Sequence, residues 1–302
     1  MTQAAVQTLP SDEGVIPRAG TAVIREILFP SDLSAASDRA FDHARSLAEH
    51  FRARLTLYHA VDPTHLAEAR QPGDPEVARR CAEAARAHLE RHAATLTTCH
   101  DILVEQDTQA AHALLKRIRT TRPDLLVMAT HGREGLAHFL LGSVTERILE
   151  AGGSPVLCVR QPDHGVALPY RRILVPTDLC ESSRRAFPLA ALLARGFHAE
   201  VLGVHVAQVK PGSLIGIPRL IEESIPSESS VVQFLLPEFV GVSVRARVEI
   251  GSPWDRIVEV AQVERADVIV LSTHGPDTLA DRVLGSHAER IIRQAPCPVL
   301  VL

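Results

Sequence analysis

The chain has 302 residues, enough for two domains of about 150 residues each, and its 46% hydrophobic content is typical of a globular protein. The net charge of −4 and the aromatic content of 4% argue against a protein that grips nucleic acid through phosphate contacts and base stacking. No apolar run approaches the roughly 20 residues of a membrane helix, and five scattered cysteines without a CxxC pair suit a reducing compartment.

The first half of the chain alternates strand and helix patterns. Residues 1–22 predict a flexible tail, and apolar runs then predict strands at 23–30, 53–60, 101–104, 124–129 and 156–159. Apolar spacing predicts helices after a Ser34 cap and over 76–96, 110–120 and 143–150. Strands separated by helices imply parallel pairing with right-handed crossovers, so this half is predicted to be a five-stranded doubly wound α/β domain.

The second half repeats the sequence blocks of the first. Residues 25–34, REILFPSDLS, match 171–180, RRILVPTDLC, at an offset of 146 positions. Two later blocks match at an offset of 143: MATHGREGLAHFLLGSVTERI with LSTHGPDTLADRVLGSHAERI, and SPVLCV with CPVLVL. Because this period is far above that of a solenoid, we predict two complete domains in tandem. The predicted division is a tail at 1–22, a domain at 23–160, a linker at 161–170 and a domain at 171–302.

The second half departs from the first at residues 213–241, where the first half has its long polar helix. Pro218, Pro226 and Pro237 interrupt any long helix in this stretch. The apolar run VVQFLLPEFV within it has two interpretations. It covers the partner domain or a second chain, or it packs on the sheet of its own domain.

Carboxylates and glycines recur where the predicted parallel strands end, which is the edge where such sheets bind ligands. Asp32 and Asp178 follow the first strand of each half, and Gly142-Ser143 and Gly285-Ser286 each open a helix. Glycine at a helix N-terminus offers backbone amides to a phosphate, and a nearby carboxylate accepts hydrogen bonds from ribose or adenine. These features fit a nucleotide, while an ordinary helix N-cap and a turn-forming Asp would require the same residue types.

Four motifs recur in both halves: I-L-x-P-[ST]-D-L, [ST]-H-G, G-S before a helix that carries E-R-I, and a closing P-V-L strand. With these motifs, both halves resemble universal stress protein domains, over about residues 23–160 and 171–302. The resemblance implies two α/β domains with strand order 3-2-1-4-5. It also implies that the final strands, 155–159 and 298–302, pair in an intramolecular pseudo-dimer, and it leaves further homodimerisation open.

In members of this family that bind ATP, the pattern is G-x-x-G, nine residues, and then G-[ST]. Gly132 and Gly142 keep this spacing, and the second half keeps it as well. The leading glycine of the pattern is absent: Ala129 holds its place in the first half, and Leu271 is interpreted as its counterpart in the second. Because leucine is bulkier than alanine, we expect a weaker site in the second half.

The loop after the strand favours the first half too. Arg133 can pair with a phosphate, whereas Pro276 lacks an amide donor and Asp277 repels an anion. The resemblance therefore implies one competent site for ATP, with or without Mg²⁺, in the first domain and a weaker site in the second. The residues implied for the first site are Pro30, Ser31, Asp32, Ala60, Val61, Ala129, His131, Gly132, Arg133, Gly135, Gly142, Ser143, Val144 and Thr145. Those implied for the second are Thr177, Asp178, Val206, Gly275, Gly285 and Ser286.

Several histidines invite a metal or catalytic interpretation. His88 and His92 stand four residues apart on a helix, a spacing that can hold zinc, but no third ligand stands at a convincing spacing and we expect both to be exposed. His59 and His205 close matching strands and are expected to be half-buried and hydrogen-bonded. His131 and its counterpart have no recurring nucleophile or acid beside them. We therefore predict no metal site and no catalytic residue.

Three hypotheses for function follow from these features. The first is a cytoplasmic stress-response protein that binds an adenine nucleotide as a regulatory ligand, with at most very slow hydrolysis, and has no nucleic-acid or membrane partner. The second is a protein of the same fold that binds no nucleotide and acts through protein–protein interaction; the missing leading glycine favours it. The third is a nucleotide hydrolase or nucleotidylyl transferase, for which the loops show no added catalytic set.

Overall fold

The structure is a computed structural model, and it describes residues 23–62, 75–130, 141–160, 168–208, 225–272 and 285–302. The predicted tail at 1–22 lies outside these residues, as do two segments that carry predicted site residues, 131–140 and 273–284. Among the described residues, none of the helices combines the length and the apolar character needed to cross a bilayer.

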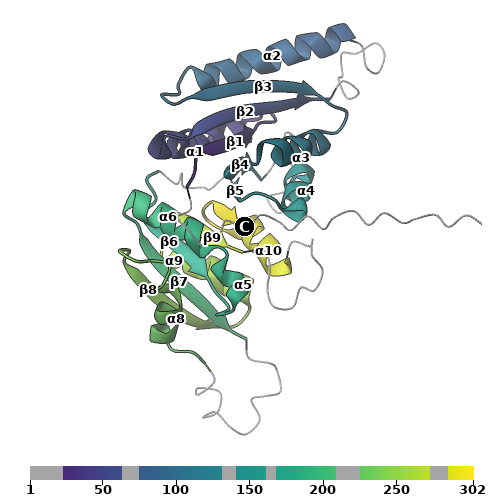
Figure 1. The fold of residues 1–302 in the computed structure, drawn as a ribbon. Helices are drawn as coiled ribbons and strands as arrows, with labels where there is room; N and C mark the ends of the chain where they lie inside the picture. Colours follow the sequence, from purple (N-terminus) through teal and green to yellow (C-terminus); the bar gives the residue numbers. More distant parts are fainter. Residues whose placement is uncertain (1–22, 63–74, 131–140, 161–167, 209–224, 273–284) are drawn as a thin grey trace, which may run out of the picture.

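The first half folds as its apolar pattern predicts, with boundaries that differ by a few residues. Its strands are β1 Glu26–Pro30, β2 Arg54–Val61, β3 His100–Gln106, β4 Leu125–Ala129 and β5 Val156–Val159. Its helices are α1 Ala35–Phe51, α2 Pro75–Ala93, α3 Ala110–Thr121 and α4 Ser143–Ala151. The five strands are parallel in the order β3-β2-β1-β4-β5, which confirms the predicted strand order (Figure 1).

The second half repeats this arrangement with a different set of helices. Its strands are β6 Arg172–Pro176, β7 Glu200–Ala207, β8 Val244–Ile250, β9 Val268–Leu271 and β10 Val299–Val301. Its helices are α5 Glu181–Arg184, α6 Phe187–Phe197, α8 Glu228–Leu235, α9 Pro253–Val263 and α10 Ser286–Gln294. Where the first half has the continuous helix α1, the second has α5 and α6, because Pro188 lacks the amide that would continue the helix from α5.

The two halves join through their final strands, as the resemblance implied. β5 and β10 pair antiparallel, with Cys158 opposite Val299 and Val156 opposite Val301, and the result is one ten-stranded sheet. Figure 1 shows β5 at the centre of the molecule, between the two sets of strands. The pairing satisfies two sheet edges that would otherwise expose unpaired backbone groups.

Each face of the long sheet carries its own apolar core. Buried side chains of α1, α2, α6 and α8 pack on one face, and those of α3, α4, α9 and α10 pack on the other. Successive residues of a strand alternate between the two cores: Ile27 and Phe29 belong to the first, and Leu28 belongs to the second. Burial on both faces explains why the strands read as continuous apolar runs.

Helix α8 decides between the two interpretations of the apolar run in 213–241. Val231 and Leu235 of α8 are buried, as is Phe239 after it, and all three pack in the core of their own domain. The helix lies close above β7 at Gly203, where even a single Cβ would clash with Leu235. One side of the run therefore packs on its own sheet, as the second interpretation has it, while Leu236 and Val240 of the same run are exposed.

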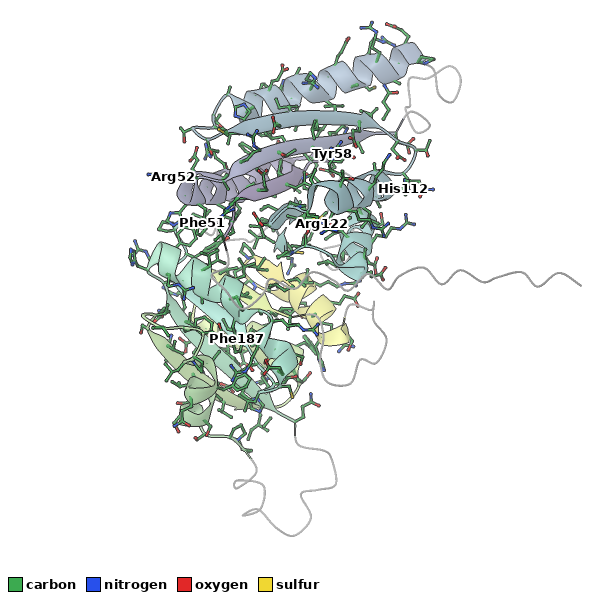
Figure 2. The ribbon with its side chains drawn as sticks, in the orientation of Figure 1. Phe51, Arg52, Tyr58, His112, Arg122 and Phe187 are labelled. Atoms are coloured by element: carbon green, nitrogen blue, oxygen red, sulfur yellow. The ribbon has the colours of Figure 1, made fainter. Side chains whose placement is uncertain are left out.

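The C-terminal ends of α1 and α6 meet at the junction of the two halves. The ring of Phe197 stacks on His50, with 4.2 Å between ring centroids, and meets Phe51 edge-on at 5.7 Å (Figure 2 labels Phe51). Tyr170, at the end of the predicted linker, is fully buried, and its ring lies 5.4 Å from that of Phe197. The last linker residue is thus part of the core that holds the halves together.

Candidate functional site

The turn after β1 begins with backbone that still belongs to the sheet. Pro30 is the last residue of β1, opposite Tyr58 of β2, and the Ser31 amide donates to the Tyr58 carbonyl at 2.8 Å. The chain then turns sharply, because Leu33 has left-handed backbone with φ 64°. Ser34 ends the turn as the N-cap of α1, and its side chain accepts the Ser37 amide, which confirms the predicted cap.

Asp32 organises this turn with its carboxylate. Its Oδ1 accepts three hydrogen bonds, from the Ser34 amide (3.0 Å), the Ser34 hydroxyl (2.6 Å) and the Ser37 hydroxyl (2.5 Å). The Asp32 amide in turn donates to the Ser37 Oγ at 3.2 Å. The carboxylate is therefore held in one orientation at the carboxyl end of β1. Asp32 thus has the turn-forming role that the sequence allowed as one interpretation.

The end of β2 lies beside that turn. His59 is hydrogen-bonded, as expected: its Nδ1 lies 2.7 Å from the Ser31 carbonyl oxygen, which ties β2 to the Asp32 turn. With 8% exposure it is more deeply buried than the half-buried residue that the sequence predicted. Ala60 is partly exposed. Val61 is 3% exposed, and its carbonyl accepts the Asp107 amide at 3.1 Å. Of the two predicted residues here, Ala60 is thus the one whose side chain reaches the surface.

On the other side of β1, the start of α4 is fastened to the end of β4. The Gly142 amide donates to the Thr130 carbonyl at 2.8 Å, and the Thr145 hydroxyl donates to the Ala129 carbonyl at 3.1 Å. A Cβ at Gly142 would stand 3.2 Å from the Thr130 oxygen, tighter than most real contacts. Gly142 is the N-cap, and no side chain of the described residues caps the helix. The first amides of α4, from Ser143 onward, therefore suit an anion.

The structure thus brings ten of the fourteen predicted first-site residues to one edge of the sheet. They stand at the carboxyl ends of three neighbouring strands, β2, β1 and β4, and at the N-terminus of α4. The other four, His131, Gly132, Arg133 and Gly135, lie outside the described residues. An edge at the carboxyl ends of parallel strands, with a carboxylate on one side and a helix N-terminus on the other, can hold a polar phosphorylated ligand.

The corresponding edge of the second half is similar in backbone and different in hydrogen bonding. His205 Nδ1 lies 3.0 Å from the Thr177 carbonyl oxygen, the contact that His59 makes in the first half. Asp178 is exposed, and its Oδ1 accepts the Cys180 amide at 3.0 Å. Val206 is partly exposed. Gly285 is the N-cap of α10, Ser286 is its first residue, and Gly275 lies outside the described residues.

One alignment made from the sequence is wrong. The pairing of β9 with β10 sets Leu271 opposite Val301, with its side chain in the core that also holds Met128. The repeated glycines of the two halves are 143 positions apart. At the same offset, Met128 is the counterpart of Leu271, and Ala129 is the counterpart of Ser272. Leucine bulk therefore gives no reason to expect a weaker second site, and the difference between the halves rests on other residues.

A cavity of about 290 Å³ lies at the opposite edge of the first half. Its walls include Glu26, Arg54 and Asp101, which stand at the amino ends of β1, β2 and β3. Arg54 and Asp101 form an ion pair of 2.9 Å with about half of each side chain exposed. Because ligands of such sheets bind at the carboxyl ends of the strands, we assign no function to this cavity.

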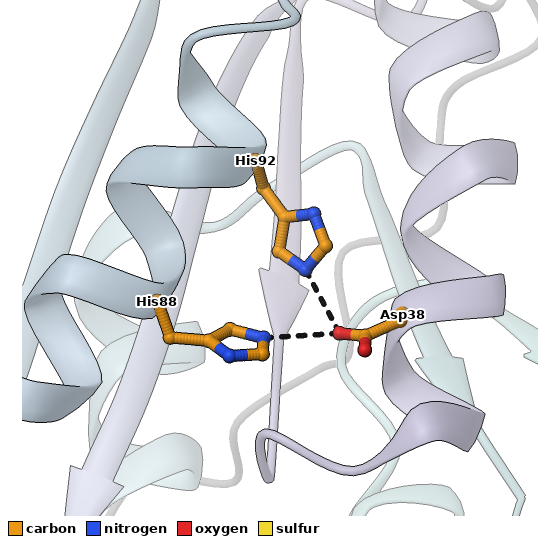
Figure 3. Close-up of side chains that lie close together, drawn as sticks. All are labelled: Asp38, His88 and His92. Atoms are coloured by element: carbon orange, nitrogen blue, oxygen red, sulfur yellow. Dashed lines mark hydrogen bonds and ion pairs between the residues drawn. The ribbon is translucent and has the colours of Figure 1, made fainter.

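The structure also corrects the prediction for His88 and His92. Both imidazoles contact Asp38, on the first turn of α1, and their side chains are 21% and 20% exposed (Figure 3). Burial alone would raise the pKa of Asp38, but hydrogen bonds from His92 and His88 outweigh it and hold that pKa below its usual value. No sequence spacing points to Asp38, because it stands 50 residues before His88 and meets it only through the packing of α2 on α1.

Comparison with known proteins places these features in context. The sequence model of the Universal stress protein family matches residues 24–160 and 169–302. A universal stress protein of Mycolicibacterium smegmatis is 26% identical over 287 residues, 91% of this chain and 96% of that protein. One of Methanocaldococcus jannaschii is 37% identical over 142 residues, 44% of this chain and 82% of that protein.

Solved structures agree with the fold. The crystal structure of a universal stress protein from Archaeoglobus fulgidus matches with a TM-score of 0.64 at 20% identity, and the match covers 91% of this chain and 97% of that one. A universal stress protein solved in complex with cAMP is 24% identical over 45% of this chain and 98% of that one, with a TM-score of 0.34. The bound cAMP is a property of that relative.

Proposed function

The chain belongs to the universal stress protein family, and on that premise we propose that its first domain binds an adenine nucleotide, ATP, as a regulatory ligand. The observation that carries the proposal is the pairing of two features at one sheet edge. The Asp32 carboxylate stands at the end of β1, and the N-terminus of α4, which no side chain of the described residues caps, follows the neighbouring strand β4. The helix N-terminus suits the phosphates, and the carboxylate suits the hydroxyls of a ribose.

We propose a weaker site in the second domain. The Asp178 carboxylate is exposed, Cys180 takes the place of Ser34, and the hydroxyl of Ser183, the counterpart of Ser37, donates to the Cys180 carbonyl instead of to the carboxylate. The hydroxyl of Thr145 that fastens α4 to β4 has no equivalent either, since the counterpart residue of α10 is Ala288. A ligand at this edge would have to order the turn and the helix start itself, which costs binding free energy.

We propose binding rather than turnover as the activity. The Asp32 Oδ1 accepts hydrogen bonds from its own turn, so this oxygen acts as a fixed element of the turn. A general base must reach the proton that it removes, and an oxygen that already accepts three hydrogen bonds from its own turn is poorly placed to do so. Hydrolysis, where it occurs, is expected to be very slow.

Calorimetric titration of the nucleotide-stripped full chain with ATP and Mg²⁺ tests the proposal. We expect one site per chain, lost in Gly142→Trp, since an indole there would fill the approach to α4, and strongly weakened in Asp32→Asn. Gly285→Trp and Asp178→Asn are the matched controls in the second half, and both should leave the main site intact. Thermal denaturation of each variant separates loss of binding from loss of fold.

Three results would overturn parts of the proposal. Unchanged affinity for ATP in Gly142→Trp would remove the site from the α4 edge. No heat with ATP, together with no co-purified nucleotide, would favour a protein that acts by protein–protein interaction, the function that the missing leading glycine at Ala129 supports. Two equivalent sites per chain would show that the second half binds as well as the first.

A further inference from the structure

Three side chains from two helices converge at a place that is separate from the proposed nucleotide site. His88 and His92 lie one turn apart on α2, and both face Asp38 on the first turn of α1 (Figure 3). Their Nε2 atoms lie 3.0 and 2.8 Å from the same carboxylate oxygen, Asp38 Oδ1. The three ligand atoms all lie within 4.8 Å of one another. We propose that Asp38, His88 and His92 form a binding site for a divalent transition-metal ion, with Zn²⁺ as its probe.

The donor set and its spacing suit such an ion. Two imidazoles and one carboxylate are common ligands of zinc, at roughly 2.0–2.2 Å, so ligand atoms around a tetrahedral ion stand about 3.4 Å apart. The observed separations of 3.0 and 2.8 Å from Asp38 Oδ1 are within a short movement of that value. Three protein ligands leave one position for water, so the site is expected to exchange its ion more readily than a closed four-ligand site.

Packing holds the ligands before any ion arrives. The ring of His92 lies on that of Phe41, with centroids 4.3 Å apart and planes at 32°. The rings of His88 and His92 are inclined at 72°, and both Nε2 atoms meet the same oxygen. Asp38 is anchored by its place in α1, where its amide donates to the Ser34 carbonyl at 3.0 Å. An ion here would join α2 to α1 at the cost of small side-chain movements.

Arg91 opposes metal binding and so offers a test that is independent of the ligands. Its guanidinium donates to His88 Nδ1 at 3.1 Å, which leaves the proton of a neutral ring on Nε2, facing Asp38. A metal ion on Nε2 requires the proton on Nδ1, so Arg91 has to turn away. A carboxylate at this place would instead accept the Nδ1 proton, the arrangement that strengthens histidine ligands of metals.

The experiment uses the full chain without a histidine tag, treated with a chelator and titrated with Zn²⁺ alone in competition with a chromophoric chelator. We expect one Zn²⁺ per chain, with affinity reduced at least about tenfold in His88→Gln and in His92→Gln. Arg91→Glu should bind about tenfold more tightly than the wild type. His112→Gln is the matched control, because His112, on helix α3, also faces a carboxylate, that of Asp107 at 3.4 Å.

Glutamine keeps a hydrogen-bonding group at each position, and the melting temperature without metal shows whether each variant folds. With Zn²⁺ added, the melting temperature should rise in the wild type and in His112→Gln, and not in the double variant His88→Gln/His92→Gln. Co²⁺ bound in place of Zn²⁺ should give the visible spectrum of a low-coordinate site in the wild type and in His112→Gln, and not in the double variant. Equal Zn²⁺ affinity in the wild type and the double variant, or no uptake by the wild type, would overturn the proposal.

Discussion

The turns after β1 and β6 have almost the same sequence, SDLS and TDLC, and different hydrogen-bond networks. Both leucines have left-handed backbone, at φ 64° for Leu33 and 63° for Leu179. In the first turn the Ser34 and Ser37 hydroxyls donate to Asp32. In the second, the Ser183 hydroxyl donates to the Cys180 carbonyl at 2.8 Å and contacts the Thr177 hydroxyl at the same distance.

A single atom explains much of this difference. Cys180 replaces the oxygen of Ser34 with sulfur, a weak acceptor, and in the second turn the Ser183 amide bonds to the Cys180 backbone carbonyl at 3.1 Å. The early end of α5 at Arg184 is a separate difference, which Pro188 explains. Duplication thus preserved the path of the backbone, and side-chain oxygens decide which copy holds its carboxylate rigidly.

The largest expected difference between the halves is a pH effect at His43, whose counterpart at the offset of 146 is Leu189. Burial lowers the pKa of His43 from 6.5 to about 4. The unfolded chain binds the His43 proton more tightly than the folded protein does. The free energy of unfolding is therefore unaffected by this group above pH 6.5, and it falls by about 3 kcal/mol as the pH falls from 6.5 towards 4. In urea denaturation across that range, His43→Leu should lack this loss; an identical pH profile in the variant would contradict the assignment.

The next effect concerns the junction of α1 and α6, where His50 of the first half corresponds to Gly196 of the second. A Cβ at Gly196 would stand 3.0 Å from Phe51 Cε1 and 3.1 Å from His50 Nε2. Gly196→His, which copies the first half, should therefore destabilise the protein by about 2 kcal/mol through overpacking. Denaturant midpoints measure the loss, with the smaller Gly196→Ala as control; a neutral Gly196→His would mean that the junction repacks freely.

Removing the two carboxylates compares the turns directly. Asp32→Ala deletes the acceptor of three hydrogen bonds and should lower the free energy of unfolding by about 1–2 kcal/mol. Asp178→Ala deletes the acceptor of the Cys180 amide at an exposed site and should cost less than about 1 kcal/mol. Equal losses in the two variants, measured by chemical denaturation, would show that the serine hydroxyls add nothing to the first turn.

The smallest expected effect is a gain. Cys180→Ser restores the hydroxyl that caps α1 at Ser34, where the side chain accepts the Ser37 amide at 3.3 Å. We expect about 0.5–1 kcal/mol of added stability, because a serine N-cap satisfies an amide that cysteine serves poorly. Ser34→Cys is the reverse exchange in the first half. In differential scanning calorimetry the melting temperature should rise in Cys180→Ser and fall in Ser34→Cys. Shifts of the same sign in both variants would refute the explanation by capping.

The sequence anticipated the fold well because its periodicity carries the relevant physics. Strands buried on both faces must be apolar throughout, and helices must place apolar residues on one side, so every strand and helix predicted in the first half is present. The Ser34 cap and the pairing of β5 with β10 were predicted as well. What the sequence left open involves contacts between distant elements, such as α8 above Gly203, which local patterns do not encode.

The candidate site was predicted less completely. Asp32 and Gly142 do stand at one sheet edge, since parallel strands end together. The alignment of Leu271 was wrong by one position, and the strand register corrected it. Nothing in the spacing of His88 and His92 indicated Asp38, because a ligand on another helix is selected by packing.

By itself the sequence determined the tandem division, the order of strands in the first half and the edge at which a ligand would bind. The division follows from repetition along the chain, the strand order follows from the family resemblance, and the edge follows from the rule for parallel sheets. Only the tertiary structure decided that Tyr170 belongs to the core, that Asp38 joins the two histidines of α2, and that Asp178 is held less firmly than Asp32. Each depends on which side chains meet across elements, and that is set by packing after the backbone path is already defined.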